Sequence, residues 1–135
     1  MSSSAAAKKA RPKYLSLSAL LFEIRMPVMA WASGMHRISG ALLFFPMTAW
    51  LLYLLDASLA SDAGFERVRG YLSHPLAKLG LLAFAWALAH HLFCGIRILL
   101  IDADKGVDAR PARASAYAVF AASLAVTAFV AWRVW

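Results

Sequence analysis

Three long apolar stretches, separated by shorter polar segments, dominate the chain. They lie at about 29–55, 75–101 and 114–133. The uncharged part of the first stretch, Ile38–Leu55, has 18 residues, and an α-helix needs roughly 20 apolar residues to cross the hydrocarbon core of a bilayer. The pattern therefore predicts an all-α integral membrane protein, in which three transmembrane helices form a helical bundle.

The remaining segments are polar and are predicted to lie outside the membrane core. Residues 1–28 are predicted to form a polar and basic tail, in which the short apolar stretch 15–23 lies in the membrane interface because it is too short to span. Residues 56–74 are predicted to be a loop, and Pro75 is expected to open the second helix. The transmembrane domain is then 29–135, and no cleaved signal peptide is expected at the N-terminus.

Composition supports a lipid environment. Hydrophobic residues make up 62% of the 135 residues, whereas a soluble domain averages about 45–50%. The net charge of +7 does not indicate a nucleic-acid partner, because the basic residues cluster at the edges of the apolar stretches, where they act as topology signals and contact anionic lipid headgroups. The single cysteine, Cys94, excludes an intrachain disulfide.

The distribution of lysine and arginine predicts the orientation in the membrane. One side of the membrane holds the larger set, which consists of Lys8, Lys9, Arg11, Lys13, Arg25, Lys105, Arg110 and Arg113. The other side holds Arg67, Arg69, Lys78 and Arg133. The N-terminus is therefore expected in the cytoplasm, or alternatively in an organelle matrix, and the C-terminus on the outer side. The expected location is the inner (cytoplasmic) membrane.

His91 is an ionisable residue near the middle of the second predicted span. It lies roughly 9 Å along the helix axis from Arg97 and roughly 16 Å from Asp102. A neutral imidazole at this depth is satisfied by a metal on one nitrogen and a carbonyl on the other, or by a hydrogen bond that only joins two helices. Gly95, one turn further on, would let a flat macrocycle approach the helix, and His90 is the competing ligand without such a glycine.

A second polar group lies at the start of the first span. Ser33, His36 and Arg37 share one helical face, where they would hold the polar head of an amphipathic ligand or bind carboxylates. Alternatively, Arg37 snorkels to the lipid headgroups and Ser33 bonds back to a carbonyl of its own helix. Arg97 is expected at the depth of Arg37, so the two would line one basic pocket for a haem propionate or an anionic lipid. Simple snorkelling of Arg97 is the other interpretation.

These residues form motifs that resemble those of the cytochrome b membrane-anchor subunit of succinate dehydrogenase, respiratory complex II. The similarity extends over nearly the whole chain and rests on two motifs together. The first comprises Arg11-Pro12, Arg25-Met26-Pro27 and Ser33…His36-Arg37-Ile38-Ser39-Gly40, and the second comprises His91, Gly95, Arg97 and Asp102. Ile98 departs from the family pattern, which often has a histidine directly after the arginine.

The resemblance implies specific roles for these residues. His91 would be an axial ligand of haem b, and Ser33 and Arg37 would belong to a ubiquinone site. His36 and Arg37 would lie near the haem propionates. The expected depth of Arg97 would place it near the propionates as well. No catalytic residue is expected in this chain, because succinate oxidation belongs to another subunit.

The expected partners follow from the same resemblance. A haem with two imidazole ligands needs two histidines, and this chain offers one well-placed candidate. The second ligand is therefore expected from another hydrophobic anchor subunit, and an iron–sulfur subunit and a flavoprotein subunit are expected on the cytoplasmic face. Electrons would pass from the iron–sulfur subunit to ubiquinone.

Three alternatives remain at this stage. The chain could be the anchor of a fumarate reductase that uses menaquinone, or a structural membrane anchor that binds no haem. A small proton-linked transporter is the third alternative, and the lack of an intramembrane carboxylate counts against it.

Overall fold

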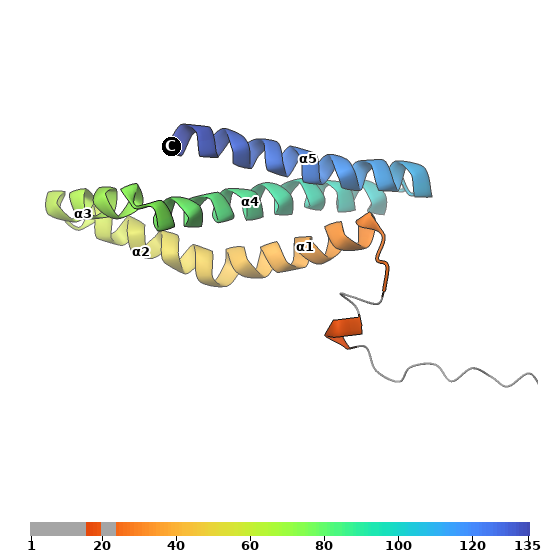
Figure 1. Cartoon of the computed structure of the whole chain (residues 1–135), viewed down its shortest axis with the longest axis horizontal. Coiled ribbons are helices and arrows are strands. Elements are labelled where there is room, and N and C mark those ends of the chain that lie inside the picture. The colour runs from red at the N-terminus through yellow and green to blue at the C-terminus, as the bar shows by residue number, and fades with distance from the viewer. Residues whose placement is uncertain (1–15, 20–23) are drawn as a thin grey trace, which may run out of the picture.

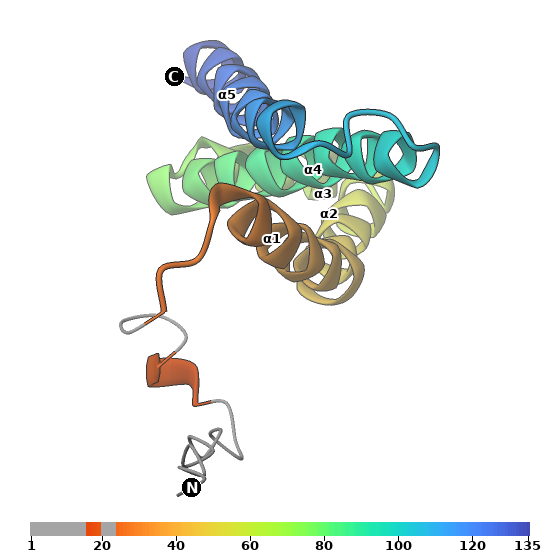
Figure 2. The same cartoon turned by 90° about the vertical axis from the view of Figure 1, so that its right-hand side faces the viewer.

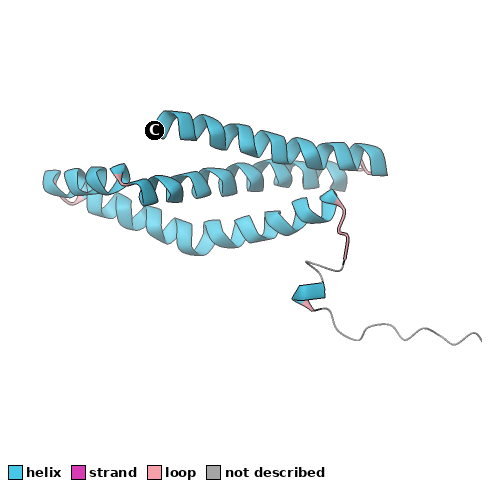
Figure 3. Ribbon diagram, in the orientation of Figure 1, coloured by secondary structure: helices cyan, strands magenta, loops and turns pink. Residues whose placement is uncertain are grey.

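The computed structural model describes residues 16–19 and 24–135, and these residues form helices and turns without strands. The elements are α1 (Val28–Leu42), the π-helical segment η2 (Leu43–Met47), α2 (Thr48–Leu59), α3 (Asp62–Ser73), α4 (Pro75–Asp102) and α5 (Ala109–Val134). Figure 3 shows this all-helical architecture. Within the described residues, three stretches are long and apolar enough to cross a membrane, namely Val28–Leu59, Pro75–Asp102 and Ala109–Val134, which confirms the predicted fold class.

The three spans lie roughly parallel, and α4 is in the middle (Figures 1 and 2). It contacts α1 on one side and α5 on the other. The core between them is built from small side chains, chiefly Ala32, Cys94, Ala116 and Val119. Small residues let helix backbones approach closely in a membrane, where apolar surface alone gives no preference for helix–helix contact over lipid.

Large apolar side chains cover the outside of the helices. Phe44 is 72% exposed and Trp132 is 73% exposed. Such exposure would favour aggregation in water, but it suits a surface that faces lipid.

The first span is one bent helix rather than a straight one, as Figure 1 shows at the junction of α1 and α2. Pro46 lies inside the bend and cannot donate a backbone hydrogen bond. The helix accommodates it with a π-turn, in which the backbone N–H and the hydroxyl of Thr48 both donate to the carbonyl of Leu43. The bend directs α2 away from α5 and toward α3.

The prediction that residues 56–74 form a loop is wrong, because α2 continues to Leu59 and α3 fills most of the rest. The side chain of Ser61 caps α3 by accepting from the backbone N–H of Gly64 at 3.0 Å. Gly64 is required there, since a Cβ atom at this position would collide with the carbonyl oxygen of Ala57. The cap and the glycine together fold α3 back against the end of α2.

Helix α4 begins as expected, with Pro75 in the first turn and the His74 side chain accepting from the N–H of Leu76. A tight turn follows α4, in which Asp104 and Gly106 have φ values of 55° and 73°. Helix α5 begins at Ala109, before the predicted start of the third span at 114, and it includes Arg110 and Arg113. The predicted interfacial segment 15–23 lies largely outside the described residues.

Candidate functional site

The two predicted polar positions His36 and His91 meet between α1 and α4. Their imidazole rings stack with centroids 4.1 Å apart and planes inclined by 6°. Nδ1 of His91 lies 3.1 Å from the backbone carbonyl oxygen of His36 and 3.3 Å from the hydroxyl oxygen of Ser39. The Ser39 hydroxyl in turn donates to the same carbonyl at 2.9 Å.

These contacts assign the tautomer of His91. A carbonyl oxygen only accepts hydrogen bonds, so Nδ1 of His91 must carry the proton. In the neutral ring, Nε2 is then unprotonated and has a free lone pair. This is the arrangement found in metal-bound histidines, in which one nitrogen donates to a carbonyl and the other binds the metal.

Two glycines line the contact between the histidines. At Gly40, a Cβ atom would lie 2.8 Å from Cε1 of His91, which is too close for an unperturbed structure. At Gly95, a Cβ atom would lie 3.6 Å from Nε2 of His36, an ordinary van der Waals distance. Gly40 therefore makes room for the His91 ring, whereas Gly95, which the sequence singled out, faces the ring of His36.

His90 lies in a different environment from His91. Its side chain is fully buried, and its Nε2 donates to the carbonyl oxygen of Ala32 at 3.3 Å. Its ring lies 5.2 Å from the rings of Trp86 and Phe120. Nδ1 of His90 is buried and has no hydrogen-bond partner among the described residues. This ring is enclosed by protein, so it acts as a contact between helices.

Ser33 and Arg37 lie one turn apart on α1, on the same side of the chain as His36. Ser33 is half-buried and Arg37 is exposed. Neither side chain has a hydrogen bond to another residue in the described part of the chain. The two polar groups are therefore available to a ligand or to lipid headgroups.

Arg97 is not brought together with Arg37 or with the histidine pair. It is buried, and it donates from Nε to the Ser115 hydroxyl at 3.0 Å and from Nη2 to the Ala112 carbonyl oxygen at 3.3 Å. Six residues along an α-helix amount to about 600° of rotation, which turns Arg97 about 120° away from His91. The guanidinium therefore faces α5, where it borders a pocket of about 300 Å³.

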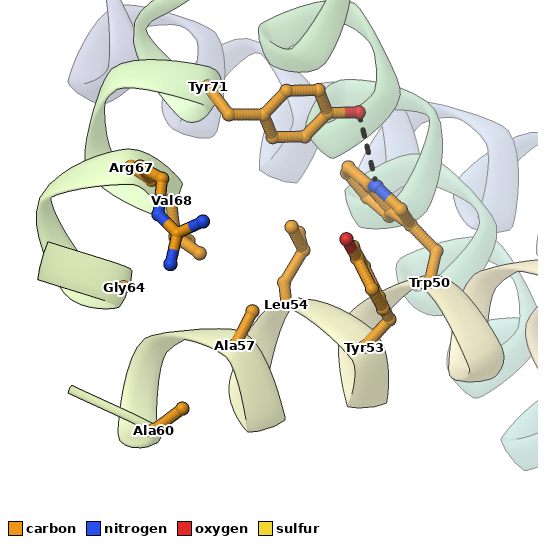
Figure 4. A pocket seen from close by; sticks show the side chains of 9 residues that line it. All are labelled: Trp50, Tyr53, Leu54, Ala57, Ala60, Gly64, Arg67, Val68 and Tyr71. Atoms are coloured by element: carbon orange, nitrogen blue, oxygen red, sulfur yellow. Dashed lines mark hydrogen bonds between the residues drawn. The ribbon is translucent and has the colours of Figure 1, made fainter.

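The other end of the molecule holds a pocket of about 420 Å³ between α2 and α3 (Figure 4). Its walls include Arg67 and the aromatic side chains of Trp50, Tyr53 and Tyr71. Trp50 donates to the Tyr71 hydroxyl at 3.3 Å. None of the candidate residues lines this pocket, so it is separate from the histidine pair.

Comparison with known proteins identifies the family to which this arrangement belongs. The family model for the succinate dehydrogenase/fumarate reductase transmembrane subunit matches residues 8–130. The chain belongs to this family.

Two relatives place the chain further within the family. Over 114 residues it is 38% identical to the succinate dehydrogenase cytochrome b556 subunit of Coxiella burnetii (strain RSA 493 / Nine Mile phase I), with 84% of this chain and 87% of that protein covered. Over 111 residues it is 32% identical to the succinate dehydrogenase cytochrome b556 subunit of Paracoccus denitrificans, with 80% and 82% covered. These matches confirm the predicted resemblance to cytochrome b anchor subunits of succinate dehydrogenase.

A membrane subunit of this family works in a complex with other subunits, and the cytochrome b name of its relatives implies haem b. The residues present here fit such a group, because the unprotonated Nε2 of His91 can bind a metal and Gly40 makes room for the His91 ring. Sequence reasoning gave no role to Ser39 or Gly40. Both lie within the first motif, and their positions one turn from His36 were the available signal.

Proposed function

We propose that the chain is the haem b-binding anchor of a succinate:ubiquinone oxidoreductase, and that it forms part of the quinone site. The observation that carries this proposal is the tautomer of His91. Its Nδ1 proton is held by a backbone carbonyl, and its Nε2 lone pair is free to bind iron. When bound, haem b supplies one-electron redox chemistry.

His91 would hold the iron, and His36 and Arg37 would lie near the propionates. In support, the half-buried His36 ring is stacked directly on the His91 ring, and Arg37 is the next residue on α1. His90 is unsuited as a ligand, because its only free nitrogen is enclosed by protein. Arg97 is left out of the haem site, because α5 holds its guanidinium.

Ser33 and Arg37 would bind ubiquinone at the membrane edge. Their half-buried and exposed positions on one face of α1 support this assignment. The Ser33 hydroxyl would donate a hydrogen bond to a quinone carbonyl. The fixed positive charge of Arg37 would stabilise negative charge as it develops on the quinone oxygen during reduction.

The second haem ligand would come from another hydrophobic anchor subunit. This chain supports that assignment, because His90 is enclosed by protein and the His36 ring is stacked on the His91 ring. An iron–sulfur subunit, with its flavoprotein partner, would dock on the cytoplasmic side and deliver the electrons. The N-terminus and the turn between α4 and α5 would face that side, where the greater number of basic residues lies.

The complex purified through a tag on this chain tests the proposal. We expect three co-purifying subunits, one haem b in a pyridine haemochrome assay, and faster succinate-dependent reduction of a ubiquinone analogue than of a menaquinone analogue. A complex without haem would make the chain a structural anchor. A preference for menaquinone, with faster fumarate reduction than succinate oxidation, would indicate a fumarate reductase instead.

A further inference from the structure

We propose that Ser39 is a positioning residue for His91, and that its hydroxyl sets the orientation of the imidazole ring. This proposal rests on the proposed binding of haem iron by His91. It adds that the spectrum and the reduction potential of the haem depend on a hydroxyl group on α1, which itself touches neither the iron nor the quinone.

The Ser39 side chain is fully buried between α1 and α4. Its oxygen lies 3.3 Å from Nδ1 of His91, and its proton is donated to the His36 carbonyl oxygen at 2.9 Å. Since that carbonyl requires the proton on Nδ1, the His91 N–H is the donor to both oxygens. The N–H group is thus held between a backbone acceptor and a side-chain acceptor.

Two acceptors restrain a ring more strongly than one. With the carbonyl alone, the imidazole can rotate about the Cβ–Cγ bond and keep a usable hydrogen bond, because the dihedral angle χ2 of histidine has a broad minimum. With the hydroxyl as well, only ring orientations that satisfy both acceptors keep both hydrogen bonds. Ser39 therefore narrows the range of ring orientations that His91 adopts.

Ser123 provides a comparison within the same chain. It is also fully buried in a transmembrane helix, and its hydroxyl donates to the carbonyl of Val119 in its own helix at 2.7 Å. Serine commonly makes this kind of bond inside helices. Ser39 makes the same kind of bond and in addition reaches a histidine on another helix, which a purely local role does not require.

The consequence for the haem follows from the chemistry of its ligand. An acceptor on the Nδ1 proton makes the imidazole more basic and stabilises ferric iron. Loss of the Ser39 oxygen should therefore raise the midpoint potential. A change in ring orientation should also shift the largest g-value of the low-spin ferric haem in the EPR spectrum.

The test compares Ser39→Ala with Ser123→Ala in the complete purified complex. For Ser39→Ala we expect bound haem, a shifted largest g-value and a more positive midpoint potential. For Ser123→Ala we expect the wild-type values of both. If Ser39→Ala has the g-value and potential of the wild type, the proposal is wrong.

A second pair of variants separates the hydroxyl from the shape of the side chain. Ser39→Thr retains the hydroxyl. In Ser39→Val the new side chain has nearly the same shape as threonine but lacks the hydroxyl. We expect a larger change in g-value and potential for the valine variant, and equal changes in the two would contradict the proposal. If the wild-type complex lacks haem, or if His91→Ala retains the native spectrum, it is the proposed function that fails.

Discussion

The imidazole rings of His36 and His91 lie face to face between α1 and α4, and the backbone carbonyl of His36 accepts a hydrogen bond from Nδ1 of His91. His36, in the first span, thereby determines which ring nitrogen of His91, in the second span, is unprotonated.

Substitution of Gly40 by alanine should displace the His91 ring. The new Cβ atom would lie 2.8 Å from Cε1 of His91, so either the ring or the α1 backbone must move. Overpacking of this kind typically costs about 1–3 kcal/mol. We expect Gly40→Ala to lower the haem content of the purified complex, measured as haem per flavin.

Gly34→Ala is the matched control for Gly40→Ala, because it lies on the same helix and its Cβ atom would meet nothing within 4 Å. Alanine is favoured over glycine in a helix interior by roughly 0.5–1 kcal/mol, so this variant should be as stable as the wild type or more so. Normal haem content in Gly40→Ala would show that the close approach of α1 does not position His91.

Removal of Ser33 or the charge of Arg37 should impair quinone reduction selectively. We expect Arg37→Gln to lower the rate of ubiquinone reduction by succinate by tenfold or more, since one hydrogen bond to a charged group contributes about 1.5–3 kcal/mol. Ser33→Ala should lower it several-fold, since a neutral hydrogen bond contributes about 0.5–1.5 kcal/mol. Reduction of a soluble artificial acceptor should remain at the wild-type rate. Arg69→Gln removes an exposed charge on α3, on the opposite side of the membrane from the proposed docking face, and should leave both rates unchanged.

The result that counts against this role is an equal loss of both activities in Ser33→Ala or Arg37→Gln. Such a loss would indicate failed assembly of the complex. Wild-type rates of quinone reduction in both variants would place the quinone elsewhere.

The orientation in the membrane can be measured with introduced cysteines. Arg69 on α3 and Val107 in the turn after α4 are both exposed, and the natural Cys94 is fully buried. We expect Arg69→Cys to react with a membrane-impermeant maleimide in intact cells, and Val107→Cys to remain unlabelled. The opposite labelling pattern would reverse the proposed topology.

Arg97→Ala should destabilise the contact between α4 and α5 without changing the haem. The substitution removes two hydrogen bonds from a buried guanidinium, each of which contributes about 1.5–3 kcal/mol. We expect a lower thermal unfolding midpoint and an unaltered haem spectrum. Lys105→Ala, at the same pocket, should leave the unfolding midpoint and the haem spectrum unchanged. A shifted haem spectrum in Arg97→Ala would show that Arg97 contributes to the haem site.

Much of the fold could be predicted from hydropathy, because the three spans are long and their polar ends are clear. Helix α3 was missed, although Ser61 and Asp62 provide the usual signals of a helix start. Its polar composition was interpreted as a loop. Neither the depth of a residue nor its motif says which neighbouring helix it faces.

The same limit applies to the site residues. The intramembrane depth of Arg97 stays a prediction, and its contact with Ser115 depends on the rotation of α4 against α5, which the sequence does not show. The contact of Ser39 with His91 likewise depends on which faces of α1 and α4 meet. The choice of His91 over His90 as the haem ligand stays a prediction, which the enclosure of His90 beside Ala32 and Phe120 supports.

The most direct test of the account is the haem content of His91→Ala and His90→Ala complexes, measured by pyridine haemochrome and normalised to flavin. We expect His91→Ala to lose haem b or to lose its low-spin bis-histidine spectrum. His90→Ala should retain both, with a lower thermal stability from the cavity left beside Trp86. Loss of haem in His90→Ala together with a native spectrum in His91→Ala would contradict the central assignment.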